Sequence, residues 1–269
     1  MATELVFEKK PKIVLTFIDS LLMIKRSSTH ILRNTDQLLG AFFQPIMFLV
    51  LFASVFGPSI SKALPEGISY INFLMAGIIV QTVAFGSTTT AISVCNDMKK
   101  GIIDRFRSLP MSSIAVLNGH VVSDIFRNAI STTVMLVAGL TIGFRPNTNF
   151  SEWLQIAGIL ILFTFAFSWL AAIVGVVAKS VEAVQWLTFI IIFPLTFASS
   201  AFTPTAGMGK YLKMFAENQP ITQVVEAVRA LILGTPIGNH GWLAVGWSVA
   251  ILCVALPVAS ILFRRKNSQ

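Results

Sequence analysis

The chain has 269 residues, of which 55% are apolar and only 12% are charged, and its net charge is +8. A soluble domain usually carries about 25% charged residues, so the composition excludes an ordinary soluble domain and favours a membrane protein, whose surface is covered largely by lipid. The basic residues lie between apolar blocks instead of forming one patch, and the aromatic residues are 22 Phe against 5 Trp and 2 Tyr, so we expect no nucleic-acid partner.

Residues 1–37 are predicted to form a cytoplasmic N-terminus that contains an interfacial amphipathic helix. Between residues 12 and 34, apolar side chains recur at helical spacing and basic residues cluster after them; the apolar positions are Ile13, Phe17, Leu21 and Ile24. A helix of this kind lies in the membrane interface. The segment has no apolar run long enough for the core of a cleavable signal peptide, so we expect the chain to reach the membrane through its first span.

Six apolar segments are expected to cross the membrane as helices. A bilayer core of about 30 Å needs roughly 20 apolar residues in a helix. The segments cover residues 38–57, 68–94, 129–144 after an amphipathic start, 153–178, 184–202 and 242–263. The sequence therefore predicts an all-α, polytopic membrane protein with one transmembrane domain of six helices over residues 38–263 and a short tail of residues 264–269.

The distribution of Lys and Arg predicts that both termini are cytoplasmic. With the N-terminus inside, the inner segments hold six basic residues before the first span, five between Lys99 and Arg127, one at Lys179 and three in the tail. The outer segments hold five, namely Lys62, Arg145, Lys210, Lys213 and Arg229. Basic residues are enriched on the cytoplasmic side of membrane proteins, so fifteen against five favours this orientation.

The segment between the last two spans, residues 203–241, is predicted to lie outside and to contain a re-entrant helical pair. Two short helical patterns, 208–217 and 221–233, are too short to span, so they are expected to dip into the outer leaflet. Glu226 and Arg229 are spaced as neighbours on one helix face. They form either an exposed ion pair or, together with Pro204 and Pro220, part of an outer gate.

The chain lacks the loop by which many proteins bind nucleotides. The pattern GxxxxGK[ST], whose backbone amides cradle phosphates, does not occur, and GMGK at residues 207–210 lacks both the spacing and the final Ser or Thr. We therefore expect no cofactor on this chain, and any ATP must be bound by a partner. The three His residues do not cluster, so we predict no metal site and no catalytic base.

The largest inner connection, residues 96–112, is predicted to contact a cytosolic partner. Charges of alternating sign surround apolar side chains there, and Pro110 would end a short helix. Such a helix could dock with apolar knobs at its centre and charges at its rim; the alternative is a solvated loop that only sets the topology. The docking residues are expected to be Lys99, Lys100, Ile102, Ile103, Arg105, Phe106, Arg107 and Leu109.

Few polar side chains lie within the predicted spans. Asp124 and Arg127 are expected at the membrane interface, because an unpaired charge at mid-bilayer would cost about 2.5–3.5 kcal/mol. The remaining groups could line a cavity that holds an apolar body and orients it by a few hydrogen bonds. They are Gln81, Thr88, Thr89, Ser168, Gln185, Thr188 and Thr196.

Taken together, these segments resemble the permease subunits of type-2 ABC exporters, particularly those of the daunorubicin-resistance kind. The resemblance rests on the basic interfacial helix, on GIIDRFRSLPMS after the second span and on residues 197–231 after the fifth. In this last stretch the matching features are Ser199, Ser200, Pro204, the Gln219-Pro220 turn and Arg229, whereas Gln223 departs from the His, Arg, Ser or Tyr that the family often has there.

The resemblance implies an assembly of two permeases with two cytosolic ABC ATPase subunits, which hold ATP and Mg. It also implies that residues 96–112 include the coupling helix and that a cavity between the two permeases carries substrate across the plasma membrane. We therefore expect a membrane subunit that exports an apolar or amphipathic compound. The alternatives are a permease for a lipid-linked polysaccharide and, from another class, an ion channel.

Overall fold

The computed structural model describes residues 35–65, 67–100 and 113–266, and all regular structure in these ranges is helical. The predicted interfacial helix and most of the predicted coupling segment therefore lie outside the described residues. The elements are α2 (Thr35–Val55), α3 (Gly57–Ile60), η1 (Ser61–Ala63), α4 (Tyr70–Gly86), α5 (Thr88–Lys99), α7 (Ser113–Ile142), α8 (Phe150–Val177), α9 (Val181–Phe197), η2 (Thr205–Gly207), α10 (Lys210–Asn218), α11 (Pro220–Leu233) and α12 (His240–Lys266).

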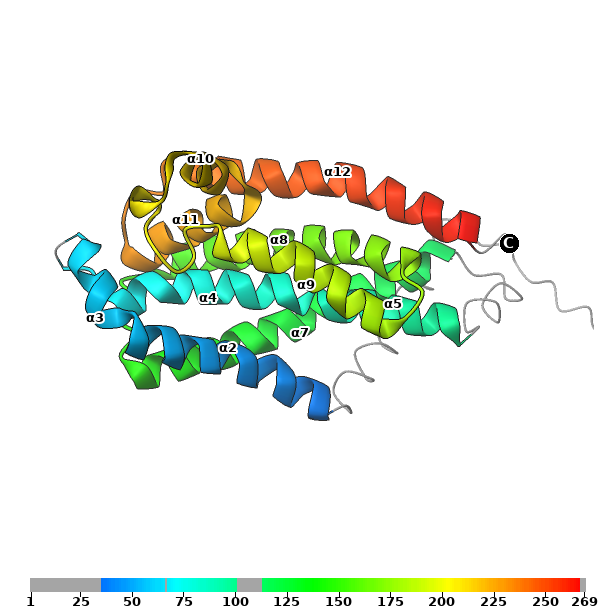
Figure 1. Ribbon diagram of the computed structural model, residues 1–269, viewed down its shortest axis with the longest axis horizontal. Helices are drawn as coiled ribbons and strands as arrows, with labels where there is room; N and C mark the ends of the chain where they lie inside the picture. The colour runs from blue at the N-terminus through cyan, green and yellow to red at the C-terminus, as the bar shows by residue number, and fades with distance from the viewer. Residues whose placement is uncertain (1–34, 66, 101–112, 267–269) are drawn as a thin grey trace, which may run out of the picture.

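The long helices run roughly along one common axis and form a bundle (Figure 1). Helix α8 is central, because it packs against α12, α5, α7 and α11. The short helices α3, α10 and α11 gather at one end of the bundle, and α5 and the C-terminus lie at the other (Figure 1). The end with the short helices is the one predicted to face outward.

Four stretches are helical, long and apolar enough to cross a membrane: Tyr70–Lys99, Ala115–Ile142, Phe150–Val177 and His240–Phe263. The first combines α4 and α5. A fifth candidate is the pair Phe42–Val55 and Gly57–Ala63, which is bent by 55°. Helix α9 is apolar but has only 17 residues, about 26 Å at 1.5 Å per residue. Length and composition therefore give four or five candidate spans, and the prediction of six is not confirmed.

Two helices have bounds that differ from the apolar segments predicted for them. Helix α9 ends at Phe197 and not at Phe202, one turn after Pro194, whose missing N–H and ring disfavour a continuous helix. Helix α7 begins at Ser113, so the amphipathic start predicted before residues 129–144 is part of the same helix. Its polar first half is helical because the bundle buries one of its faces, which includes Leu117 and Val121.

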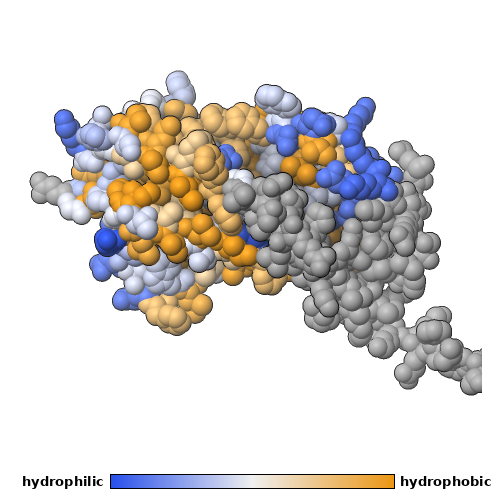
Figure 2. All heavy atoms as spheres, turned by 90° about the horizontal axis from the view of Figure 1, so that it is seen from below, coloured by the Kyte–Doolittle hydropathy of each residue, from blue (hydrophilic) through white to orange (hydrophobic). Residues whose placement is uncertain are grey.

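The outer surface of the bundle is rich in apolar side chains. On one face, apolar residues form a broad band and hydrophilic residues collect toward the two ends (Figure 2). Large exposed apolar side chains occur on α2, α7, α8, α9 and α12, for example Phe43, Val137, Leu154, Trp186 and Val254. A soluble monomer rarely exposes so much contiguous apolar surface, and lipid accounts for it.

Segments of the bundle approach each other closely at two glycines, because glycine has no side chain to keep them apart. A Cβ built on Gly77 of α4 would collide with the backbone of Ala201, and one built on Gly175 of α8 would collide with the backbone of Ala91. Small residues allow such close approach between membrane helices. Gly139 also lies against Met75, whereas Gly143 adopts a positive φ of 110° in the turn after α7.

We expect Gly77→Ala to destabilise the protein. The added methyl group meets backbone atoms that cannot rotate away, and overpacking of this kind costs typically about 1–3 kcal/mol. Gly158→Ala is the matched control, because nothing lies within 4 Å of its Cβ position and alanine favours the helix. Thermal unfolding in detergent should show a lower midpoint for Gly77→Ala only. An equal midpoint for both variants would contradict the close contact between α4 and Ala201.

Candidate functional site

The chain leaves helical geometry immediately after α9, inside the bundle. Residues 199–202 are buried yet non-helical, so their backbone groups lack helical partners. In a lipid-covered protein such groups must be satisfied by other parts of the protein. Gln219 of the α10–α11 turn supplies one donor, because its Nε2 lies 2.7 Å from the carbonyl oxygen of Leu195 and 3.1 Å from that of Ala198.

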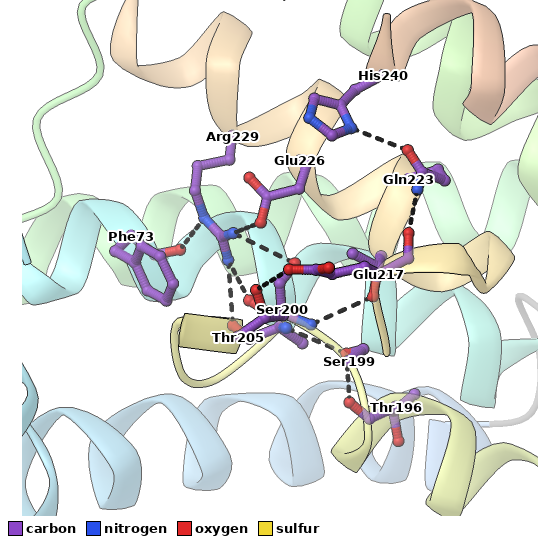
Figure 3. A network of polar contacts seen from close by, with 12 residues as sticks. Phe73, Thr196, Ser199, Ser200, Thr205, Glu217, Gln223, Glu226, Arg229 and His240 are labelled. Carbon is purple, nitrogen blue, oxygen red and sulfur yellow. Dashed lines mark hydrogen bonds and ion pairs between the residues drawn. The ribbon is translucent and has the colours of Figure 1, made fainter. Parts of the chain in front are cut away.

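Arg229 of α11 supplies the main set of donors to this segment (Figure 3). Its Nη2 lies 2.6 Å from the carbonyl oxygen of Ser200, and its Nε lies 3.2 Å from that of Phe73 on α4. The guanidinium carbon also lies 3.6 Å from the centre of the Phe73 ring, a cation–π contact. Arg229 thus ties three segments together: α11, α4 and the non-helical stretch.

The charge of Arg229 is balanced within its own helix. Glu226 accepts a hydrogen bond of 2.6 Å from Nη1, and the Arg229 side chain is 5% exposed against 30% for Glu226. Burial lowers the pKa of Arg229 to about 10, and the carboxylate of Glu226 opposes that shift, so the guanidinium stays charged at neutral pH. Of the two alternatives for this pair, the exposed one was wrong, since Arg229 is buried.

Further side chains complete this outer network. The hydroxyl of Tyr70 donates to the carbonyl oxygen of Phe202 at 3.0 Å. The Nε2 of Gln223 donates to the carbonyl oxygen of Glu217 at 2.5 Å, and the Oε1 of Gln223 lies 2.8 Å from the Nδ1 of His240 (Figure 3). These bonds link α10, α11 and α12. Pro220 is the first residue of α11, where a missing N–H costs nothing, and Pro204 precedes η2.

A second polar cluster lies in the interior, on α7. Asp124 and Arg127 are paired and almost fully buried, and Ser168 of α8 donates a hydrogen bond to the carboxylate of Asp124. Both residues lie within the candidate span Ala115–Ile142 and inside the bundle, so the prediction of an interfacial position is not confirmed. The i, i+3 spacing did indicate the pair, and pairing is what makes burial of two charges tolerable.

Arg127 also contacts the break between α4 and α5. Its Nη2 donates to the carbonyl oxygen of Gly86, where α4 ends and the regular helical bonding is interrupted. A Cβ on Gly86 would collide with the side chain of Asn128. Two consecutive residues of α7, Arg127 and Asn128, therefore contact Gly86 directly at the break between α4 and α5.

A cavity of about 330 Å³ adjoins this break, between α2, α4, α5, α7 and α9. Its lining is mixed: Phe48 and Phe85 are apolar, whereas Gln81, Arg127 and Asn128 are polar. At its outer side, Phe48 and Phe52 of α2 approach Phe197 of α9, with ring centres 6.4 and 6.2 Å apart. These rings join α2 to α9 above the cavity.

The structure brings together only some of the predicted cavity residues. Gln81, Thr89 and Gln185 line the cavity, and Ser168 bonds to Asp124 behind it. Thr188 and Thr196 donate to carbonyl oxygens of their own helix, at 2.7 Å from Val184 and 3.0 Å from Ile192. Thr88 does not line the cavity. Sequence reasoning missed Asn128, which carries no signal of its own beyond its place one residue after Arg127.

The end of the bundle that is predicted to face the cytoplasm holds the described part of the predicted coupling set. Lys99 and Lys100 are exposed at the end of α5, and the other members lie outside the described residues: Ile102, Ile103, Arg105, Phe106, Arg107 and Leu109. Close to Lys99, the Nε2 of His120 on α7 lies 2.9 Å from the Oδ2 of Asp97 on α5. This contact, which the sequence did not indicate, joins the two helices that flank residues 101–112.

Comparison with known proteins accounts for this architecture. The family model described as "ABC-2 type transporter" matches residues 20–233. The chain belongs to the ABC-2 type transporter family. It is therefore a multi-pass membrane permease, and this family lacks the ATPase domain.

Several curated relatives are similar in sequence to this permease over most of its length. A daunorubicin resistance ABC transporter permease of Streptomyces coeruleorubidus is 31% identical over 87% of this chain and 81% of its own length. A probable doxorubicin resistance ABC transporter permease of Mycobacterium tuberculosis is 24% identical over 93% of this chain and 90% of its own length. Nodulation protein J of Rhizobium meliloti is 25% identical over 85% of this chain and 86% of its own length.

Replacing Arg229 should loosen the outer network. In Arg229→Met the non-helical carbonyl oxygen of Ser200 loses its donor, and a buried group left unsatisfied costs about 1–3 kcal/mol. The carbonyl oxygen of Phe73, inside α4, loses its additional donor. We expect a lower thermal midpoint and faster proteolysis between residues 198 and 210. Lys213→Met is the control, because Lys213 and its partner Glu217 are about half exposed and 3.8 Å apart. If both variants unfold at the wild-type temperature, the network does not hold this end of the permease together.

Proposed function

We propose that this permease is the membrane subunit of an ATP-driven exporter that moves an apolar or amphipathic compound out of the cell. The observation that carries the proposal is the mixed cavity next to the break in α4–α5, whose apolar walls and few polar groups suit an amphipathic molecule. The drug-resistance names of two relatives support the same class of substrate.

A lipid-linked polysaccharide is the weaker alternative. A conduit for a sugar polymer would need aromatic rows that stack on sugar faces, and the chain has only two Tyr. The aromatic row along α9 is formed mainly by Phe, namely Phe189, Phe193 and Phe197. Phe offers an apolar face without a hydrogen-bonding tip, which suits an apolar body better than a glycan.

The proposed topology has six crossings, with both termini in the cytoplasm. In this arrangement the bent pair α2–α3 is the first span, and α9 with residues 198–202, of which 199–202 are buried, is the fifth. The outer network supports the second assignment, because it satisfies the backbone groups that α9 leaves open at this depth. Helices α10 and α11 then form the outer re-entrant pair. The pair of Arg229 and Glu226 stabilises these two helices in their closed position.

The proposed assembly has two copies of this chain and two cytosolic ABC ATPases. ATP-driven closure of the ATPases would act on residues 96–112, between α5 and α7. The Asp97–His120 contact supports this route, because it makes the ends of these two helices move as a unit. The same two helices carry Thr89, Arg127 and Asn128 of the cavity, so a displacement at the inner end reaches the site without a further element.

Cysteine labelling tests the orientation. In a variant without Cys95 and Cys253, single cysteines at positions 62, 147 and 213 should react with a membrane-impermeant maleimide added from outside. Cysteines at positions 99 and 266 should react only after the membrane is opened. The basis is the excess of basic residues in the inner segments. Outside labelling at position 99 would reverse the proposed orientation.

Purification from the native membrane tests the exporter assignment. The full-length chain should copurify with a protein that contains a nucleotide-binding loop, and the complex should hydrolyse ATP faster when hydrophobic drugs or lipids are added. Phe106→Asp should abolish copurification, because it places a charge in the expected apolar contact. Tyr211→Asp is the control, since Tyr211 is exposed on α10 at the opposite end of the bundle.

Two outcomes would contradict the assignment. If Phe106→Asp retains its ATPase partner and full stimulation, residues 96–112 do not couple the subunits. If lipid-linked glycans alone stimulate ATP hydrolysis, the substrate belongs to the polysaccharide class.

A further inference from the structure

The cavity next to the α4–α5 break contains amide groups that the fold leaves without partners. Three amide atoms have no hydrogen-bond partner among the described residues: the Nε2 and Oε1 of Gln81 and the Nδ2 of Asn128. Both residues are nevertheless at least 97% buried. Buried polar groups are nearly always paired in folded proteins. Since both side chains line the cavity, the missing partners are expected to come from a molecule bound there.

The charge distribution around the cavity shows which kind of molecule fits. Arg127 is the single charged residue among the described lining residues, and no carboxylate lines the cavity with it. The carboxylate that pairs with Arg127 belongs to Asp124. It also accepts a hydrogen bond from Ser168, on the side of Arg127 away from the cavity. Within the described residues, the hydrogen bonds that Arg127 donates come from Nη2, which leaves Nε and Nη1 as further donors for an occupant. The site therefore offers hydrogen-bond donors to an occupant, and of the Arg127–Asp124 pair it is the guanidinium that lines the cavity.

A site of this kind favours oxygen atoms that accept hydrogen bonds. Carboxylate, phosphate, carbonyl and hydroxyl oxygens can all accept from Arg127, Asn128 and the Nε2 of Gln81, and charged oxygens form the stronger bonds. The Oε1 of Gln81 is the one acceptor among the unpartnered atoms, and a hydroxyl group or a water molecule can donate to it. A quaternary ammonium group has nothing to donate or accept here, and it would face the positive charge of Arg127 without a carboxylate on its side of the cavity.

The size and opening of the cavity fit one end of an amphipathic molecule. Its volume of about 330 Å³ lies at the lower limit of small-molecule sites. Gln44 of α2 and Gln185 of α9 line it and are themselves exposed, so the cavity opens between these two helices. Outside, α9 presents Trp186 and Phe189, which are 67% and 44% exposed. An apolar tail can lie along these rings while the polar end is inside.

We propose that this cavity binds the acceptor-oxygen end of an amphipathic molecule through Gln81, Arg127 and Asn128, and that it discriminates against cationic amphiphiles. The inference rests on the exporter function proposed above, since it specifies the chemistry of the transported compound. It concerns binding to the permease alone, so it can fail or succeed independently of the ATPase partner. Bound water is the competing occupant, because water could also satisfy the amides.

Photolabelling of the purified full-length permease in phosphatidylcholine nanodiscs tests the proposal. Three probes share one alkyl chain with a diazirine and differ only at the end: a carboxylate, a hydroxyl or a trimethylammonium. The carboxylate probe should label peptides that cover residues 81–92 and 127–131 most strongly, the hydroxyl probe less and the ammonium probe least. Competition by added phosphatidylglycerol would identify a bilayer lipid as the occupant, and its absence a free amphiphile; both retain the acceptor chemistry.

Two variants remove the amides without disturbing the Arg127–Asp124 pair. Gln81→Leu and Asn128→Ala should each reduce labelling by the carboxylate probe about tenfold, as expected for losing a hydrogen bond to a charged group. Both should keep or raise the thermal midpoint in the absence of probe, because each removes an unsatisfied buried group. Gln155→Leu is the matched control, since Gln155 is exposed on α8 and does not line the cavity; it should leave labelling unchanged.

Specific outcomes would overturn the proposal. Equal or stronger labelling of the cavity by the ammonium probe would show that acceptor oxygens are not selected. Unchanged carboxylate labelling in both amide variants, with a raised thermal midpoint, would show that water alone satisfies Gln81 and Asn128. If one variant fails to fold, the other still decides between these results, because each removes a different donor from the same cavity.

Discussion

The structure depends on one constraint: a backbone polar group that lipid surrounds must find its partner inside the protein. Uninterrupted helices meet this requirement by themselves, but two segments of this permease are interrupted. Arg229 supplies donors where the chain leaves α9, and Arg127 supplies a donor where α4 gives way to α5. In both cases the arginine is buried and is neutralised by an acidic residue three positions earlier on its own helix, Glu226 or Asp124.

The two interruptions differ in what surrounds them. The outer one is densely bonded, since Tyr70, Gln219 and Arg229 donate to four carbonyl oxygens there, those of Leu195, Ala198, Ser200 and Phe202. The inner one adjoins a cavity, and two amides there remain without partners among the described residues. The outer network also contains one buried atom without a partner among the described residues, the Oε1 of Gln219. A densely bonded network resists change, whereas a cavity with several unpartnered groups is stabilised by a ligand. The outer network thus suits a closed gate, and the inner cavity suits a binding site.

Membership of the ABC-2 family means that energy must enter from another polypeptide. On the proposed mechanism it enters between α5 and α7, whose inner ends are joined by Asp97 and His120. Of these two helices, α7 also contacts Gly86 at the break, through Arg127 and Asn128. An occupant that bonds to Arg127 therefore contacts a residue that also fixes the break. This arrangement lets substrate binding and ATPase movement bias the same element, as coupling between two sites requires.

Composition and apolar segment length alone predicted the helical membrane fold, the positions of the long helices and the two short outer helices, because burial in lipid demands long apolar runs whatever the tertiary arrangement. The pattern around residues 199–229 also indicated the family. Sequence could not show that α9 stops at Phe197, that Asp124 and Arg127 are interior, or that Asn128 lines a cavity with Gln81. Those outcomes depend on which face of each helix meets its neighbours, since a polar side chain is costly or tolerable only according to the partners that the packed bundle provides.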